Sequence, residues 1–261
     1  MMKEKRPNVQ SVDEEGEKLE ESSKIQAGEK RKRQDLDSDD EEVKEDDLSK
    51  QPPITIILDL ASLETVKTKK GDFQLLNCDD HIGLLRKHKR EPGEYRPDII
   101  HQELMAVLDS PLNKAGKVRV LVHTEKNVLF EISNKTRIPR TFKRFSGLMV
   151  QLLHRLKIRS SDGRDMLLKV IKNPISRHIP AGAKCIGFSD KGRLMSPHAL
   201  AASLPHDLPV VFVFGAQATR GIVMADHPYM EEMVAISQHP LSGVVAVNRV
   251  LGAMEHVYNI M

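Results

Sequence analysis

The sequence predicts an α/β domain with a mainly parallel sheet, preceded by a charged N-terminal tail. Short apolar runs of strand length alternate with longer segments in which apolar residues recur every three to four positions, a pattern typical of parallel sheets covered by helices. The chain of 261 residues is long enough for one domain with a substantial core. We therefore expect one domain over residues 51–261 and a disordered tail over residues 1–50.

Charge separates the tail from the body. Residues 1–50 carry 17 acidic and 11 basic side chains and no aromatic residue, which gives a net charge of −6, whereas residues 51–261 carry a net charge of +9. A tail with so few apolar residues cannot bury enough surface to offset the entropy of ordering. Its basic cluster at residues 30–33 is typical either of a nuclear import signal or of solvated charge.

The strands are predicted from apolar and β-branched runs. The first lies at residues 54–58, where an unbroken run is typical of a strand buried on both faces. Further runs of the same kind predict strands at residues 118–122, 128–132, 167–171 and 210–214.

Three helices are predicted from apolar periodicity and from their first residues. Asp98 follows Pro97 and is expected to cap the first helix. An amphipathic helix of period near 3.6 begins at Phe142, and the last helix follows Pro240 with Ser242 as its N-cap.

Composition and motif spacing exclude several functional classes. No apolar run approaches the ~20 residues of a membrane span, and the N-terminus lacks the apolar core of a secretory signal, so we expect neither. Cys78 and Cys185 cannot form a disulfide framework or a cysteine-rich zinc site. The histidines lack the HExxH spacing, so no metal site is expected. Neither a Walker loop nor a G-x-S-x-G elbow is present.

The densest basic segment of the body spans residues 137–144 and contains no acid. Its cations are Arg137, Arg140, Lys143 and Arg144. Arginine suits phosphate because its planar, permanently charged fork binds two oxygens at once, and the amides at a helix N-terminus add to the attraction. With the basic body, we interpret this segment as a surface for a phosphate-rich partner. The alternative is a solvated face, or arginines paired with carboxylates elsewhere.

Arg96 and the glycines near the C-terminus are two further candidates. Asp98 lies within reach of Arg96 and is expected to orient its guanidinium as well as to cap the helix. Gly215 and Gly221 follow the strand at residues 210–214, where a glycine permits close approach of a ligand to the carboxyl end of a strand. Taken alone, these glycines indicate an ordinary turn rather than a cofactor loop.

Together these segments resemble the pseudouridine N1-methyltransferases of small-subunit ribosome assembly, a branch of the SPOUT class with a trefoil knot. The resemblance covers about residues 53–261. Its motifs are Arg96-Pro97-Asp98-Ile99, Asp109-Ser110-Pro111-Leu112-Asn113, His123-Thr124 with Lys126-Asn127-Val128, Thr136-Arg137-Ile138-Pro139-Arg140-Thr141-Phe142, Leu167-Leu168-Lys169-Val170-Ile171-Lys172-Asn173-Pro174, Gly215-Ala216 and Pro240-Leu241-Ser242.

The resemblance implies an S-adenosylmethionine-dependent methyltransferase whose knotted C-terminal loops hold the cofactor. The cofactor positions it implies are Gly187, Gly215, Gly221, Ile222, Ile236, Ser237, Gln238, His239, Pro240 and Leu241. The RNA-contacting residues it implies are Arg96, Arg137, Arg140 and Arg144, with Asp98 holding Arg96.

The implied partners are small-subunit ribosomal RNA, pre-ribosomal particles and a second copy of the chain, and the implied location is the nucleus and nucleolus. No catalytic base can be assigned from the sequence. A non-catalytic RNA-binding assembly factor that retains the fold is the principal alternative, and an enzyme acting on a small anionic metabolite is another.

Overall fold

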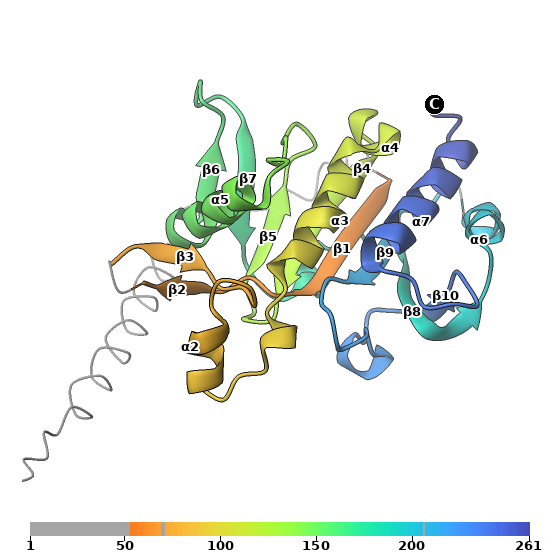
Figure 1. Cartoon of the computed structure of the whole chain (residues 1–261). Coiled ribbons are helices and arrows are strands. Elements are labelled where there is room, and N and C mark those ends of the chain that lie inside the picture. The colour runs from red at the N-terminus through yellow and green to blue at the C-terminus, as the bar shows by residue number, and fades with distance from the viewer. Residues whose placement is uncertain (1–52, 69–70, 206) are drawn as a thin grey trace, which may run out of the picture. The chain divides into compact units, whose positions relative to one another are not determined.

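The computed structural model describes residues 53–68, 71–205 and 207–261; the tail and its basic cluster at residues 30–33 lie outside the described residues, and the boundary at residue 50 stays a prediction. An eight-stranded sheet runs through the body in the order β10-β8-β9-β1-β4-β5-β7-β6 (Figure 1). Its strands in chain order are β1 (Ile54–Ala61), β4 (Val118–Thr124), β5 (Leu129–Ile132), β6 (Lys157–Arg159), β7 (Met166–Ile171), β8 (Lys184–Leu194), β9 (Val210–Gly215) and β10 (Glu232–Ala235). A separate ribbon pairs β2 (Thr65–Lys67) with β3 (Phe73–Leu75).

The sheet has a parallel part and an antiparallel part. Strands β10, β8, β9, β1 and β4 are parallel, as predicted, whereas β5, β7 and β6 pair antiparallel. A parallel pairing after β4 would need a crossover of a dozen or more residues, but only a four-residue turn separates β4 from β5. Asn127 in this turn has a left-handed backbone with φ of 58°. All five predicted strands are confirmed as β1, β4, β5, β7 and β9.

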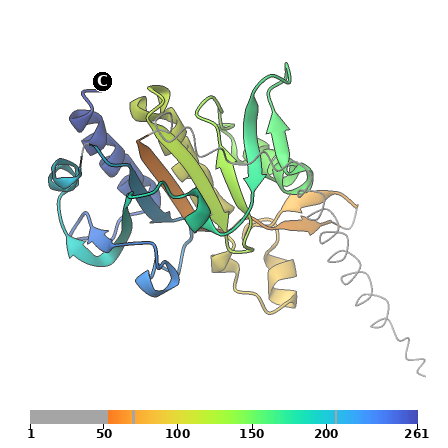
Figure 2. The same ribbon diagram turned by 180° about the vertical axis from the view of Figure 1, so that it is seen from behind.

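Three longer helices lie over one face of the sheet: α3 (Pro97–Asp109), α5 (Phe142–Arg155) and α7 (Gly243–Val257). α3 lies between the other two in both views and packs side by side with α7 (Figures 1 and 2). The larger core cluster forms between these helices and the sheet, and a smaller one covers the opposite face, where Ile57 and Val211 pack against the single-turn segment η4 (Ile175–His178). The remaining elements are α2 (Ile82–Lys87), η3 (Pro92–Glu94), α4 (Pro111–Lys114), α6 (Pro197–Ser203) and η5 (Met224–Asp226). Among the described helices, none combines the length and the apolar character needed to cross a bilayer.

The helix starts confirm two predictions and correct one. α5 begins at Phe142, and α7 begins directly after its N-cap, Ser242. The prediction that Asp98 caps α3 is wrong, because Arg96 is the N-cap and α3 has no side-chain cap hydrogen bond. Pro97 takes the first helical position, where its missing N–H costs nothing, and this places Asp98 inside the first turn.

Candidate functional site

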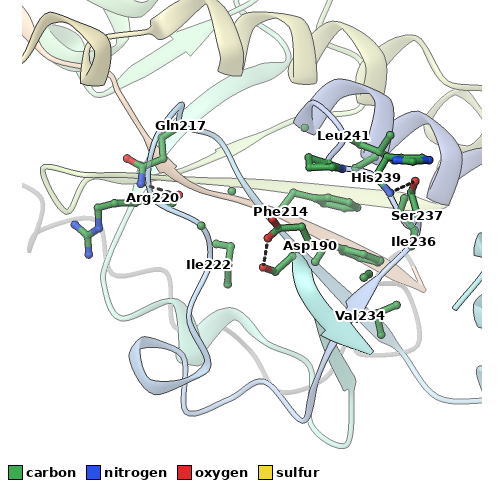
Figure 3. A pocket seen from close by; sticks show the side chains of 18 of the residues that line it. Asp190, Phe214, Gln217, Arg220, Ile222, Val234, Ile236, Ser237, His239 and Leu241 are labelled. Atoms are coloured by element: carbon green, nitrogen blue, oxygen red, sulfur yellow. Dashed lines mark hydrogen bonds between the residues drawn. The ribbon is translucent and has the colours of Figure 1, made fainter. Parts of the chain in front are cut away.

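A cavity of about 270 Å³ opens where β9 and β10 end and α7 begins (Figure 3). Three stretches contribute to its lining: residues 188–190 in β8, residues 214–222 at and after β9, and residues 234–246 from β10 into α7. Ligands of open α/β sheets bind at the carboxyl ends of parallel strands, and this cavity occupies such a place.

Eight of the ten predicted cofactor positions line this cavity. They are Gly215, Gly221, Ile222, Ile236, Ser237, His239, Pro240 and Leu241. The fold therefore brings together two loops that are about twenty residues apart in the sequence.

Gly187 and Gln238 do not line the cavity. A Cβ at Gly187 would overlap the sulfur of Met230, so the open side of this buried glycine is filled by a methionine. The residues of β8 that follow it, Phe188 to Asp190, line the cavity in its place. Gln238 is exposed.

The cavity combines apolar walls with two charged side chains at its rim. Phe214, Ile222 and Ile236 are buried, and a Cβ at Gly215 would lie 3.4 Å from Ile222 Cγ1, so a larger residue there would narrow the cavity. Asp190 and Arg220 are exposed lining residues of opposite charge (Figure 3). The volume is close to the lower limit of ~300 Å³ for small-molecule sites. Apolar walls suit a flat ring, and a rim with both charges suits a zwitterionic group, so these residues fit S-adenosylmethionine.

Hydrogen bonds fix both loops that line the cavity. Gln217 Nε2 donates to the carbonyl of Arg220 at 2.9 Å, and the N–H of His239 donates to Ser237 Oγ at 3.0 Å (Figure 3). The loops are thus held by local bonds that leave the cavity open.

The basic segment is exposed at all four of its cations, Arg137, Arg140, Lys143 and Arg144. Arg140 Nη2 lies 2.7 Å from Asp109 Oδ2. This arginine is thus paired with a carboxylate distant in the sequence, which was the alternative to a free phosphate-binding side chain. Both side chains are largely exposed, so the pair contributes about 1 kcal/mol or less, and a phosphate can compete for the guanidinium. Within the described part of the chain, neither Arg137 nor Arg144 forms an ion pair. Arg140 precedes α5, so it does not share a helical face with Arg144.

His101 on α3 fixes the backbone of the basic segment. Its Nε2 donates to the carbonyl of Pro139 at 2.8 Å, and its ring stacks on Phe145 with centroids 4.4 Å apart. This contact fixes the backbone between Arg137 and Arg140, so both side chains project from a rigid stretch of the chain.

Arg96 and Asp98 form the predicted contact with two bonds. Arg96 Nε donates to Asp98 Oδ1 at 2.8 Å and Arg96 Nη2 donates to Asp98 Oδ2 at 2.6 Å. The hydrogen bond from Arg96 lowers the pKa of Asp98, so the carboxylate stays charged near neutral pH. The guanidinium is thus held in one orientation before any ligand arrives.

One copy of the chain does not gather the four arginines beside the cavity. Arg96 precedes α3, whereas the guanidinium of Arg140 contacts Asp109 at the other end of this helix, about 20 Å away at 1.5 Å per residue. The cavity lies at the start of α7, and the basic segment leads into α5, on the other side of α3 (Figure 1). A single copy therefore does not form one continuous arginine surface next to the cavity.

Comparison with known proteins identifies the family. The model of the EMG1/NEP1 methyltransferase family matches residues 56–255. This chain belongs to the EMG1/NEP1 methyltransferase family. The resemblance read from the motifs is confirmed, and the chain is a methyltransferase.

Relatives with the same architecture occur in animals and archaea. The chain is 49% identical over 214 residues to the ribosomal RNA small subunit methyltransferase NEP1 of Drosophila melanogaster, covering 80% of this chain and 83% of that protein. It is 49% identical over 208 residues to the NEP1 of Homo sapiens, again covering 80% and 83%. The crystal structure of Archaeoglobus fulgidus Nep1 bound to S-adenosylhomocysteine superposes with a TM-score of 0.66 at 24% identity, covering 78% of this chain and 98% of that one. The trefoil knot stays a prediction.

Sequence reasoning missed Glu103, a buried acid directly behind the cavity wall. Its side chain is 0% exposed, and neither carboxyl oxygen has a hydrogen-bond partner among the described residues. Burial raises the pKa of Glu103 to about 8. A Cβ at Gly243, which lines the cavity, would overlap Glu103 Oε1, so the glycine makes room for the acid. The visible signal is an acid three residues after Ile100, on the edge of the apolar face of α3.

Sequence reasoning also missed a buried cluster at the end of β1. The carboxylate of Asp59 contacts both His123 and His227, and Asp59 is 2% exposed. The available signal was a single acid within an otherwise apolar strand; the contact to His227, 168 residues further on, could not be read from the sequence.

Proposed function

We propose that this chain transfers a methyl group from S-adenosylmethionine to N1 of a pseudouridine in small-subunit ribosomal RNA. The observation that carries the proposal is the cavity at the start of α7, where eight of the ten predicted cofactor positions meet. The names of the animal relatives support the RNA substrate, and the S-adenosylhomocysteine bound in the archaeal crystal structure supports the cofactor.

The cavity residues bind and orient the methyl donor. Phe214, Ile222 and Ile236 would contact the adenine ring, while Arg220 and Asp190 at the rim would pair with the carboxylate and ammonium of the methionine portion. The bound cofactor supplies an electrophilic methyl group on a sulfonium. The main task of these side chains is to hold that group in line with the attacking nitrogen, because positioning accounts for much of the barrier in such displacements.

The arginines supply the affinity for RNA. Arg96, Arg137, Arg140 and Arg144 neutralise phosphates and present an unpaired base, since sequence-specific RNA recognition favours splayed-out bases in loops. Because one copy separates these arginines from the cavity, a homodimer is the arrangement that would bring the basic segment of one copy to the cavity of its partner. Asp98 serves this surface by holding Arg96.

The proposed setting is the pre-ribosomal particle in the nucleolus. The basic cluster at residues 30–33 would direct nuclear import, and deletion of residues 1–50 should abolish nuclear accumulation while in vitro methylation persists.

Two measurements test the proposal. Titration calorimetry of the full chain with S-adenosylmethionine should show one site per chain, and mapping of methylated pseudouridine in ribosomal RNA should show one position that loses its methyl group when the chain is removed. Absence of cofactor binding with retained RNA binding would instead support the non-catalytic assembly factor.

A further inference from the structure

We propose that Asp59 is a positioning residue of the cofactor cavity, which it supports by holding both ends of the segment at residues 216–227. This segment contains the lining residues Gln217 to Ile222, so fixing its ends fixes one wall of the cavity (Figure 3). The inference rests on the proposed function only in taking the cavity as the site of S-adenosylmethionine.

The first end is held by the backbone of Asp59. Asp59 lies opposite Gly215 in the β1–β9 pairing, and its carbonyl accepts the N–H of Ala216 at 2.7 Å. Ala216 is 0% exposed, so this bond is shielded from water. The segment therefore leaves the sheet from a fixed point.

The second end is held by the carboxylate of Asp59. Its Oδ2 accepts a hydrogen bond from Nε2 of His227, and His227 is 5% exposed. We call these two attachments of Asp59, to Ala216 and to His227, the loop clamp. One residue of β1 thus connects to positions 216 and 227 at once.

The hydrogen bonds of His227 determine its charge. Its Nδ1 lies 2.9 Å from the carbonyl of Val223, and its Nε2 contacts the carboxylate of Asp59. Both partners only accept hydrogen bonds, so both ring nitrogens must carry a proton, and His227 is an imidazolium paired with a carboxylate. A neutral His227 would lose one of the two bonds. The loop clamp therefore depends on the protonation of His227.

The remaining bonds of Asp59 keep its carboxylate ionised and oriented. Its Oδ1 accepts from Nδ1 of His123 at 2.7 Å and from the N–H of Leu60 at 2.7 Å. Leu60 has a left-handed backbone with φ of 59°, a strained conformation for a branched side chain of the kind that concentrates at functional sites. The Nε2 of His123 contacts Asn127 Oδ1 at 3.0 Å, outside the loop.

The titratable groups around the clamp agree with this charge state. Burial by itself would raise the pKa of Asp59, but hydrogen bonds from His123 and His227 outweigh it and lower this pKa to about 2. The hydrogen bond to Asp59 raises the pKa of His227, with Asp226 adding to the effect, and burial raises that of Tyr229. For His123, burial opposes protonation, but the bonds to Asp59 and Asn127 outweigh it and raise its pKa. The clamp is thus complete below the ordinary histidine pKa of ~6.5 and is lost as the pH rises through the raised pKa of His227.

The decisive variant is His227→Ala in the full chain, with two matched controls. His123→Ala removes the other imidazole of Asp59 without touching the segment, and His178→Ala removes a half-buried histidine whose Nε2 also contacts a backbone carbonyl, that of Lys172. Hydrogen exchange of the Ala216–Ile222 amides in the cofactor-free chain should show about tenfold lower protection in His227→Ala, and normal protection in both controls. Unchanged protection in His227→Ala would overturn the proposal.

Cofactor binding supplies the second readout. S-adenosylmethionine should bind His227→Ala about tenfold more weakly at pH ~6, with kcat at saturating cofactor and KM for RNA within about twofold of the parent. Because Glu103 titrates beside Gly243 in the same range, the pH series is run in the Glu103→Gln background. There the parent should lose affinity as the pH rises from ~6 to ~9, and the added His227→Ala should reduce this loss. The part that remains belongs to the cofactor's own ammonium group and to His123.

Two further outcomes separate the possible failures. A pH dependence of the same size with and without His227 would overturn the clamp, even if His227→Ala melts at a lower temperature. If the parent binds no S-adenosylmethionine at any pH, the proposed function fails, while the hydrogen-exchange result still decides whether Asp59 holds the segment. Should His227→Ala fail to fold, Asp59→Asn, which keeps the backbone bond to Ala216 but weakens the pairing with His227, takes its place with the same expected results.

Discussion

The cavity and the basic segment are built in opposite ways. The cavity is lined by residues drawn from several elements between 188 and 246, including the buried apolar side chains of Phe214, Ile222 and Ile236, whereas the basic segment presents exposed cations within residues 137–144. Substitutions around the cavity should therefore act through stability and shape, and substitutions in the basic segment should act on binding alone.

Glu103→Gln should give the largest effect and confirm that the buried carboxyl of Glu103 lowers the stability of the fold at neutral pH. With the folded pKa of Glu103 raised to about 8, folding stability is full below the ordinary carboxyl pKa near 4.5 and falls as the pH rises towards 8, a loss of about 3 kcal/mol at pH 7. Gln cannot ionise, so urea unfolding of Glu103→Gln should show greater stability at pH 7 and a flatter pH profile than the parent. An identical slope in both proteins would mean that Glu103 is not buried as an acid.

Gly192→Ala should lower the free energy of unfolding by about 2 kcal/mol and weaken cofactor binding. A Cβ at Gly192 would overlap the backbone of Val234, next to lining residues Ala235 and Ile236, and a backbone clash cannot be relieved by turning a side chain. Thermal unfolding with calorimetric titration measures both effects.

The control is Gly147→Ala in α5, where no atom lies within 4 Å of the added Cβ. This variant should gain roughly 0.5–1 kcal/mol, because alanine favours the helix. If both alanines had the same effect on cofactor binding, the link between β8–β10 packing and the cavity would be refuted.

Arg144→Ala should weaken RNA binding by about 1 kcal/mol, roughly fivefold, and leave the melting temperature unchanged, because Arg144 is exposed and forms no ion pair among the described residues. The slope of log affinity against log salt should flatten by about 0.7–0.9 for each lost phosphate contact. Filter binding to a ribosomal hairpin over a salt series measures it. An unchanged slope would remove Arg144 from the RNA surface, and Arg155→Ala at the far end of α5 is the matched control.

Asp98→Ala should lower the free energy of unfolding by less than about 1 kcal/mol, because the side chains of the Arg96–Asp98 pair are more than one-third exposed and Asp98 does not cap α3. Asp98→Gly should cost more than Asp98→Ala, by roughly 0.5–1 kcal/mol, because glycine is unfavourable inside a helical turn. Urea unfolding ranks the two variants, and the opposite order would restore Asp98 as the N-cap. Both variants should weaken RNA binding, because Arg96 loses the two hydrogen bonds that orient its guanidinium.

Local patterns predicted the elements that are apolar and continuous, and missed those that are not. The run at residues 54–58 identified β1, but β8 escaped because Gly187, Ser189 and Asp190 interrupt its pattern where it lines the cavity. β10 escaped because it has only four residues at the edge of the sheet.

The residues of the candidate site also divide into those that the sequence predicted and those that it missed. Most cavity positions followed from the family resemblance, which carries spatial information that periodicity lacks. The sequence could not show that Met230 fills the open side of Gly187 and keeps this residue out of the cavity lining. Nor could it show that Arg140 forms an ion pair with Asp109. Asp59 and His227 are 168 positions apart in the sequence, and a local sequence pattern cannot predict a contact between residues so far apart.

The position of α7 has a practical consequence for experiments on the intact chain. Its fifteen residues begin at the cavity and end close to Met261, so at 1.5 Å per residue a fluorophore or affinity label fused after Met261 would sit about 20 Å from the methyl donor. Glu255 Oε1 accepts the N–H of Leu112 at 3.4 Å and tethers the far end of the helix to α4. A reporter attached after Met261 would therefore follow cofactor binding from outside the cavity.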